Sequence, residues 1–352
     1  MRSAIAAVLS YEAQKKKYTN KIRNPRGEGG VVGVIGSGGA LPTNWAQINS
    51  AGLSQEVIGG GVEDGLPYTD LRYFGTSTSA ANIQIRFDQS TNAAAVAGQA
   101  WGFDFWVKAQ SGAAPQISAV IGSFAVGSSL TTVAQSASIA PNSAKIRVEA
   151  KGVVSAATAD NVRAYLFMPL ANSTAYDFTI RIYAPKLVQI ASIEGPELVT
   201  NGDFASGTTG YTPVSSTIAA VAGELELTGV GSPYPSAYQS FTSVVGQVYV
   251  ARARGRKGTA ANAQLLLQNS FTSLAQTTTT SSSLVDFTPI YAAAVSTSTK
   301  ITASISNGGA ESGTAYFDNL SVKQVTPGYM PAFPILPAVG VIADSIGYGI
   351  AA

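Results

Sequence analysis

The sequence predicts an all-β protein built from two consecutive β-sandwiches, and two observations lead to this prediction. Several segments alternate between apolar and polar side chains, which is typical of an antiparallel sheet with one solvated face. The chain also contains an internal repeat whose two copies open and close with related segments. Gly-, Ser- and Asn-rich connectors separate the alternating segments, and no long helical periodicity interrupts them.

Length and composition agree with this class. The 352 residues allow two or three domains, and a hydrophobic share of 45% is enough for a sizeable core. Charged residues make up only 12%, about half of the usual share. Ser, Thr, Ala and Gly fill the difference, as in β-rich extracellular or virion proteins. A GC-rich genome would also enrich Ala and Gly.

Several functional classes are excluded by the residue counts. A net charge of +2 indicates no nucleic-acid partner. Because the sequence has no cysteine and no histidine, it cannot supply a disulfide, a zinc site or a Ser-His-Asp triad. No apolar run approaches the ~20 residues of a membrane span. The first residues, MRSAIAAVLSYEAQ, make a poor export signal because their apolar region is short.

The first segment, 1–21, predicts a short helix. Ile5, Val8 and Leu9 follow the spacing of one helix face, and the lysines from Lys15 to Lys17 suit the negative C-terminal end of a helix. An Asn-Pro pair ends the segment. The helix would either cover the first sandwich or dock on another subunit, and its narrow apolar stripe favours docking. We therefore expect an N-terminal anchor.

Alternation is clearest in the first unit. The segment AWGFDFWVKAQ places Trp101, Phe103, Phe105 and Val107 on one face and Trp106 on the other. The segments AYDFTIRIYA and AKIRVEAKG follow the same rule. One face of each predicted strand is therefore expected to lie in a sandwich core and the other to be solvated.

The repeat sets the domain limits. The first copy runs from NKIRNPRGEGG to YDFTIRIYAPKLVQI, and the second from PELVTNGDFASGTTGY to GTAYFDNLSVKQV. Each copy has a middle strand after Gly-Gln and a late strand, AKIRVEA or TKITASI, which we take as equivalent. These segments predict domains at 22–192 and 196–326, joined by ASIEGPE. The Pro-rich TPGYMPAFPILPA predicts a stiff linker in an extended tail, 327–352.

The second copy resembles a family. Its opening ELVTNGDFASGTTGY and closing AYFDNLSVKQV resemble the two ends of a carbohydrate-binding-module-like jelly roll, found in glycan-degrading enzymes and phage fibres. The first copy, with RNPRGEGG, LPTNWAQ and YAPKLVQI, is similar to jelly-roll domains of tailed-phage virion proteins. The resemblance covers roughly 22 to 326 and implies two tandem jelly-roll sandwiches.

This resemblance implies a structural calcium ion where the two chain ends of a sandwich meet. The matching positions in the second unit are Glu197, Asp203 and Asp318, and carboxylate oxygens suit this hard cation. The alternative is that Asp203 only caps a turn beside Gly202. An arginine and an alanine stand near the corresponding places of the first unit, where no calcium is expected.

The resemblance also implies sugar binding through aromatic rings. Trp106 is the first candidate, because it lies opposite the apolar face of its strand; Tyr234 and Tyr238, in SPYPSAYQS, are the second. The alternative is that an outward aromatic ring is covered by a neighbouring subunit or by the other edge of the sandwich. The basic cluster from Arg252 to Lys257 is either a solvated edge or a contact with an acidic sugar, and the edge is favoured.

The last residues resemble a third element. VGVIADSIGYG resembles block I of the SGNH (GDSL-type) hydrolases, in which Ser345 matches the nucleophile, Asp344 its neighbour, and Ala343 replaces the usual glycine. Such enzymes also need later Gly and Asn residues and an Asp-x-x-His. None of these later blocks is present in the sequence as given, so we expect a truncated esterase domain and no hydrolysis by the chain as given. A fortuitous strand-turn ending is the alternative.

Together these features predict a bacteriophage virion fibre or spike. Its N-terminal part would attach to other virion proteins, and its sandwiches would bind host surface polysaccharide; the resemblance implies a homotrimer on the particle surface. The alternatives are a secreted bacterial carbohydrate esterase with two binding modules, or a purely structural virion decoration protein.

Overall fold

The all-β prediction is confirmed. A computed structural model describes residues 18–48, 51–88, 93–125, 130–155, 159–305 and 310–332, and within these ranges every regular element is a strand. No helix in the described part has the length and hydropathy needed to cross a bilayer. Most of the predicted N-terminal helix lies outside the described residues, and its last residues, from Tyr18 to Lys21, have no regular secondary structure.

The first sandwich consists of two antiparallel sheets. One sheet has the order β1 (Gly33–Val34), β3 (Ser54–Glu63), β4 (Leu66–Thr76), β12 (Ala175–Ile190), β7 (Ala100–Ser111) and β10 (Ile146–Val153). The other has the order β2 (Ala46–Ile48), β5 (Ala81–Arg86), β11 (Asn161–Leu170), β8 (Ser118–Phe124) and β9 (Thr131–Gln135), with β6 (Ala93–Ala94) also on β11.

The second sandwich repeats this plan. Its larger sheet has the order β15 (Ser216–Val221), β16 (Glu224–Gly229), β26 (Thr314–Pro327), β19 (Val248–Lys257) and β22 (Val285–Asp286), with β13 (Ser192–Glu197) on β26 and β23 (Ile290–Ala293) on β19. The other sheet, named here the groove sheet, has the order β14 (Thr212–Val214), β18 (Ser236–Thr242), β24 (Ser298–Ser304), β20 (Ala263–Asn269) and β21 (Thr272–Thr279). A small ribbon pairs β17 (Ser232–Pro233) with β25 (Ala310–Glu311).

Each sandwich has its own hydrophobic core, formed by the faces that the alternation predicts. In β7, Trp101, Phe103 and Phe105 are almost completely buried in the first core. They face apolar residues of β5, β8 and β11 in the opposite sheet. In the second core Leu265 of β20 and Phe317 of β26 come from opposite sheets. Burying aromatic and branched side chains between two sheets is what stabilises a sandwich.

Strand order corrects one part of the predicted repeat. The strands after Gly-Gln, β7 and β19, occupy the same place beside the closing strands β12 and β26. The late strands do not correspond. AKIRVEA lies in β10, next to β7, whereas TKITASI lies in β24, at the centre of the groove sheet. The strand that matches β24 by position is β11, so the two segments share a local pattern but not a place in the fold.

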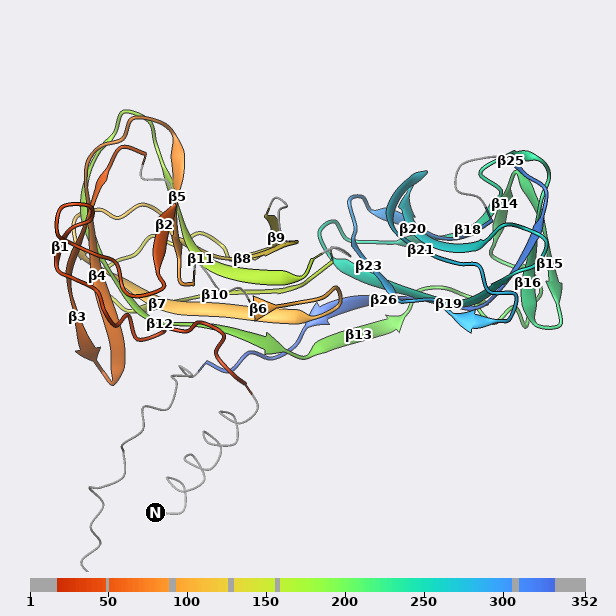
Figure 1. The fold of residues 1–352 in the computed structure, drawn as a ribbon, viewed down its shortest axis with the longest axis horizontal. Coiled ribbons are helices and arrows are strands. Elements are labelled where there is room, and N and C mark those ends of the chain that lie inside the picture. The colour runs from red at the N-terminus through yellow and green to blue at the C-terminus, as the bar shows by residue number, and fades with distance from the viewer. Residues whose placement is uncertain are drawn as a thin grey trace, which may run out of the picture.

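The two sandwiches lie end to end and share a third apolar cluster (Figure 1). β12 leads through Ala191 into β13, which pairs with β26, so the predicted connector ASIEGPE is itself a sheet strand. The cluster packs Val188 and Val153 of the first unit against Val250 and Val325 of the second. The sandwiches are therefore joined through packed side chains as well as through the chain.

The segment after β26 returns to the first sandwich. Met330 is buried in the shared cluster, and a side chain in place of Gly102 on β7 would overlap with it. Tyr18 belongs to the same cluster, and Lys21 donates its N–H to the carbonyl of Leu187 at 2.8 Å. The start of the predicted stiff linker is thus packed on the domain surface, while residues 333–352 lie outside the described part.

Candidate functional site

The outer surface of the groove sheet is hollowed into a groove of about 410 Å³, a size found in small-molecule sites. Its floor follows from strand register, because residues directly opposite each other on paired strands share a face. Tyr238 of β18, Thr302 of β24 and Leu266 of β20 form one row across the sheet. The residues between them, such as Leu267 and Ala303, point into the core.

Aromatic residues stand along this groove. Tyr238 is half-buried on β18, whereas Tyr234, before that strand, is 64% exposed. Phe271 lies in the turn between β20 and β21 and is 71% exposed. The backbone on the N-terminal side of that turn is left-handed at Ser270, with a φ of 54°. Exposed rings of this size on one concave face are typical of a binding surface.

Polar side chains complete the groove. The buried Thr302 donates its hydroxyl to Oε1 of Gln268 at 2.7 Å. Gln264 is also buried and donates from Nε2 to the Thr278 hydroxyl at 3.4 Å. Ser304 donates to the carbonyl of Pro235 at 3.0 Å. These bonds hold amide and hydroxyl groups in place beneath the aromatic rim, where they can meet the hydroxyls of a ligand.

One cation lies among these neutral groups. The ammonium of Lys300 is 4.0 Å from the ring centroid of Tyr238 and 4.6 Å from that of Phe271. Contacts of this kind stabilise a cation by about 0.5–2 kcal/mol, depending on how far it is desolvated. Lys300 therefore bridges the two sides of the groove and covers a face of the Tyr238 ring.

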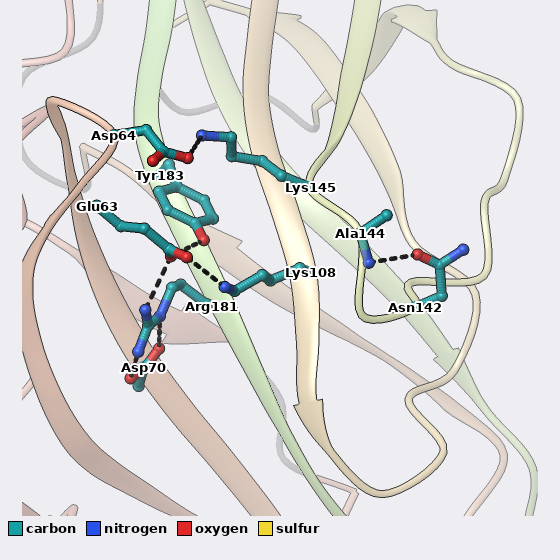
Figure 2. A network of polar contacts seen from close by, with 9 residues as sticks. All are labelled: Glu63, Asp64, Asp70, Lys108, Asn142, Ala144, Lys145, Arg181 and Tyr183. Atoms are coloured by element: carbon teal, nitrogen blue, oxygen red, sulfur yellow. Dashed lines mark hydrogen bonds and ion pairs between the residues drawn. The ribbon is translucent and has the colours of Figure 1, made fainter.

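The first sandwich carries a different polar cluster, on the outer face of its β3-β4-β12-β7-β10 sheet (Figure 2). Arg181 binds Asp70 through two hydrogen bonds of 2.7 Å and Glu63 through one of 2.9 Å. Glu63 also accepts from Lys108 at 2.6 Å and from the hydroxyl of Tyr183. The Lys108, Tyr183 and Arg181 bonds lower the pKa of Glu63 to about 2. Because its charges are paired, we interpret this cluster as a connection between strands.

A second charged cluster of the first sandwich is buried beneath the returning segment. Asp104 is 3% exposed; its carboxylate lies 3.3 Å from the ammonium of Lys186 and accepts from Arg147 Nε at 2.6 Å. Lys186 also donates to the carbonyl of Pro331. Burial raises the pKa of Asp104 and lowers the pKa of Lys186. The charge of each residue acts on the pKa of the other in the reverse direction, but burial has the larger effect. The cluster ties the segment after β26 to the first domain.

The structure separates the three predicted sugar-binding residues. Tyr234 and Tyr238 both line the groove. Trp106 lies in the other sandwich, half-buried on β7, opposite Tyr183 on one side and Arg147 on the other. It thus stands between the two charged clusters and does not join the groove. Sugar contact by any of the three stays a prediction.

The three predicted calcium ligands are not gathered into one site. Among the described residues, no group of three acidic, His or Cys side chains is arranged to hold a metal ion. Glu197 accepts the N–H of Val322 at 2.7 Å and the hydroxyl of Ser321 at 2.6 Å. Asp203 accepts the N–H of Ala205 at 3.3 Å, as in the alternative in which it caps a turn, and Asp318 accepts that of Asn319 at 2.7 Å. Each of the three carboxylates thus accepts a backbone N–H, and calcium binding by them stays a prediction.

The basic cluster on β19 consists mainly of paired side chains. Arg252 bonds to Glu194, with one N–O distance of 3.1 Å, and Arg256 lies 3.0 Å from Glu224. Arg254 lies 3.6 Å from Asp286. These pairs agree with a solvated face. The predicted edge is wrong, because β19 lies between β26 on one side and β22 and β23 on the other. Ser345 and Asp344 lie outside the described residues.

Phe271, Lys300 and the two glutamines were not predicted from the sequence. The segment AQLLLQN around Leu266 has three consecutive leucines, so its alternation is hidden. In STKITAS the alternation is visible, with Lys300 and Thr302 opposite Ile301 and Ala303. That strand could have indicated a polar outer face, but its place beside β18 and β20 follows only from the fold.

The comparisons with known proteins found similar structures, but no matching family model and no matching curated protein. Among solved structures, the chain is similar to the N-terminal tandem CBM22 domain of Paenibacillus barcinonensis Xyn10C, with 10% identity, a TM-score of 0.30, and coverage of 87% of this chain and 100% of the other.

Two single modules show a comparable likeness. A CBM4 structure has 16% identity and a TM-score of 0.33 over 48% of this chain and 99% of its own. The family 11 carbohydrate-binding module of the Clostridium thermocellum cellulase Lic26A-Cel5E has 16% identity and a TM-score of 0.31 over 49% of this chain and 95% of its own. Because these scores are low, the fold assignment rests on the strand pairing of this chain.

Proposed function

We propose that the chain is a glycan-binding protein and that the groove of the second sandwich is its binding site. The observation that carries this proposal is the combination of three aromatic rings with buried amide and hydroxyl groups in one groove of about 410 Å³. A ring such as Tyr234 offers a flat apolar surface to the C–H face of a sugar. Gln264 and Gln268 supply donors and acceptors for sugar hydroxyls.

The test uses the full chain, because the two sandwiches share a packed cluster. The fluorescently labelled protein, presented multivalently, is applied to a glycan array. The variant Tyr234→Ala/Tyr238→Ala is expected to lose at least about tenfold in binding, since aromatic residues dominate many binding surfaces. Tyr329→Ala, at an exposed ring outside the groove, is the matched aromatic control and is expected to bind as the wild type does. Absence of binding by the wild type, or equal binding by the double variant, would contradict the proposal.

We also propose a setting for this binding, namely a phage fibre or spike attached to the particle by its N-terminal part. The low share of charged residues and the resemblance of both repeats to phage jelly rolls support it. The end-to-end arrangement of the sandwiches suits a spacer that extends from a surface (Figure 1). Assembly as a homotrimer would convert weak single-site binding into avidity.

Light scattering of the full chain, and detection of the protein in purified particles, test this setting. A trimeric mass and recovery with particles are expected. Recovery only from culture medium would favour the secreted carbohydrate esterase with two modules, whereas particle association without glycan binding would favour a decoration protein.

A further inference from the structure

We infer that the groove selects an anionic glycan and that Lys300 is the residue that determines this selection. The inference rests on the proposed glycan-binding function and adds the substrate class. The expected ligand is a sugar that carries a negatively charged group, either a carboxylate or a sulfate.

The first observation is the isolation of the charge. Across the five described strands of the groove sheet, Lys300 is the only residue with a charged side chain. No carboxylate occurs among the residues that line the groove. The groove thus has a formal charge of +1, carried by one ammonium group.

The second observation is the contrast with other cations of the same sandwich. Arg252 and Arg256 lie on the opposite sheet, and each is within 3.1 Å of a glutamate oxygen. Lys300 instead contacts two aromatic rings and is half-buried between them. A lysine ammonium has three donors, and ring faces satisfy its charge only in part.

The position of Lys300 affects how a sugar can stack on Tyr238. Lys300 occupies a face of the Tyr238 ring, so a neutral sugar stacking there has to displace the ammonium and lose the cation–π contact. A sugar with a negative group can instead pair that group with the ammonium at the rim. The surrounding side chains lower the local dielectric relative to bulk water, which strengthens such a pair. Lysine acts as a point charge, so carboxylate and sulfate are both suitable.

The experiment measures binding of the full chain to two matched pairs of immobilised polysaccharides. One pair is polygalacturonic acid and its carboxyl-reduced product, and the other is a sulfated galactan and its desulfated product. The wild type is expected to prefer the acidic member of at least one pair by about tenfold, equivalent to about 1.4 kcal/mol. The pair that shows the preference identifies carboxylate or sulfate as the recognised group. Raising the salt concentration from about 0.05 to about 0.5 M should reduce the preference, because salt screens exposed charges.

Three variants assign the effect to the residue. Lys300→Met keeps the aliphatic stem and removes the charge, so it should bind both members of a pair equally. Lys300→Arg should keep the preference. Lys257→Met removes the same charge from β19, outside the lining of the groove, and should bind as the wild type does. Thermal unfolding of each variant shows whether it is folded.

The outcomes distinguish the two proposals. Equal binding of acidic and neutral members by the wild type, or a preference that survives in Lys300→Met, would overturn the selection of an anionic glycan while leaving glycan binding intact. Binding of no member of either pair would overturn the inference as well, and the broader glycan array then decides the proposed function separately.

Discussion

The smaller sheets of the two sandwiches have equivalent strand orders but differ in how their outer faces are used. In the first, Tyr165 on the central strand β11 is only 4% exposed, and Gln135 of β9 donates to Ser118 at 2.9 Å. Arg163 lies 4.8 Å from the ring of Phe124, and burial lowers its pKa. In the second, the matching face is open and neutral except for Lys300. Sharing a fold therefore does not mean sharing a site.

The same contrast extends to charges elsewhere in the two units. Asp104 and Glu63 of the first sandwich are bound by neighbouring cations, so their main effect is on folding stability. Lys300 of the second has no carboxylate beside it among the groove residues, so its main effect should be on binding. Substitutions in the two regions should thus change different quantities.

The largest expected effect is on the buried pair of the first sandwich. Asp104→Ala leaves the ammonium of Lys186 buried without its counter-ion and should lower the free energy of unfolding by about 3–5 kcal/mol. Chemical denaturation measures this loss. Asp286→Ala, at an exposed carboxylate 3.6 Å from Arg254, is the control and should change stability by less than about 1 kcal/mol. Equal losses in both variants would remove the distinction between buried and exposed pairs.

An intermediate effect is expected at the rim of the groove. Phe271→Ala should weaken binding to the strongest ligand of the array at least about fivefold, because an exposed ring that contacts ligand is removed. Its stability should stay within about 0.5 kcal/mol of the wild type. Tyr329→Ala, at a ring that is also largely exposed but outside the groove, should change neither quantity. Calorimetric titration and thermal unfolding check both; a stability loss without a binding loss at Phe271 would contradict the contrast.

The smallest effect concerns acid stability. The folded pKa of Glu63 is about 2, below its ordinary 4.5, so its contribution is present above about pH 4.5 and is lost as the pH falls toward 2. The stability advantage of the wild type over Glu63→Gln should therefore shrink across this window. Denaturation curves at several pH values measure it, and an advantage that does not change with pH would show that the ion pairs of Glu63 contribute nothing to stability.

Much of the fold could be predicted because the alternation of apolar and polar residues along a strand follows which of its faces is buried. Trp101, Phe103 and Phe105 face the first core as their spacing predicts. The equivalence of AKIRVEA and TKITASI failed because a local alternation does not say which sheet a strand joins. The Pro-rich segment predicts a stiff linker, yet its start packs on the first domain, where Met330 is buried. A single buried side chain in a polar or Pro-rich segment has no periodicity that would indicate it.

The groove could be predicted only in part. Tyr234 and Tyr238, both from the segment SPYPSAYQS, were predicted as the second candidates. Phe271 and Lys300 come from other strands and turns, and only the pairing of β18, β24 and β20 brings them to the same face. Trp106 is the first sugar-binding candidate from the sequence, but it lies outside the groove, with Tyr183 and Arg147 beside it across β7.

Hydrogen–deuterium exchange of the full chain, with and without the glycan that it binds most strongly on the array, tests whether the groove of the second sandwich is the binding site. We expect slower exchange in residues 234–240, 264–271 and 298–304 of the second sandwich, with no change in β5, β8 and β11 of the first. Protection confined to the first sandwich, or bound glycan with no protection in the groove segments, would contradict it.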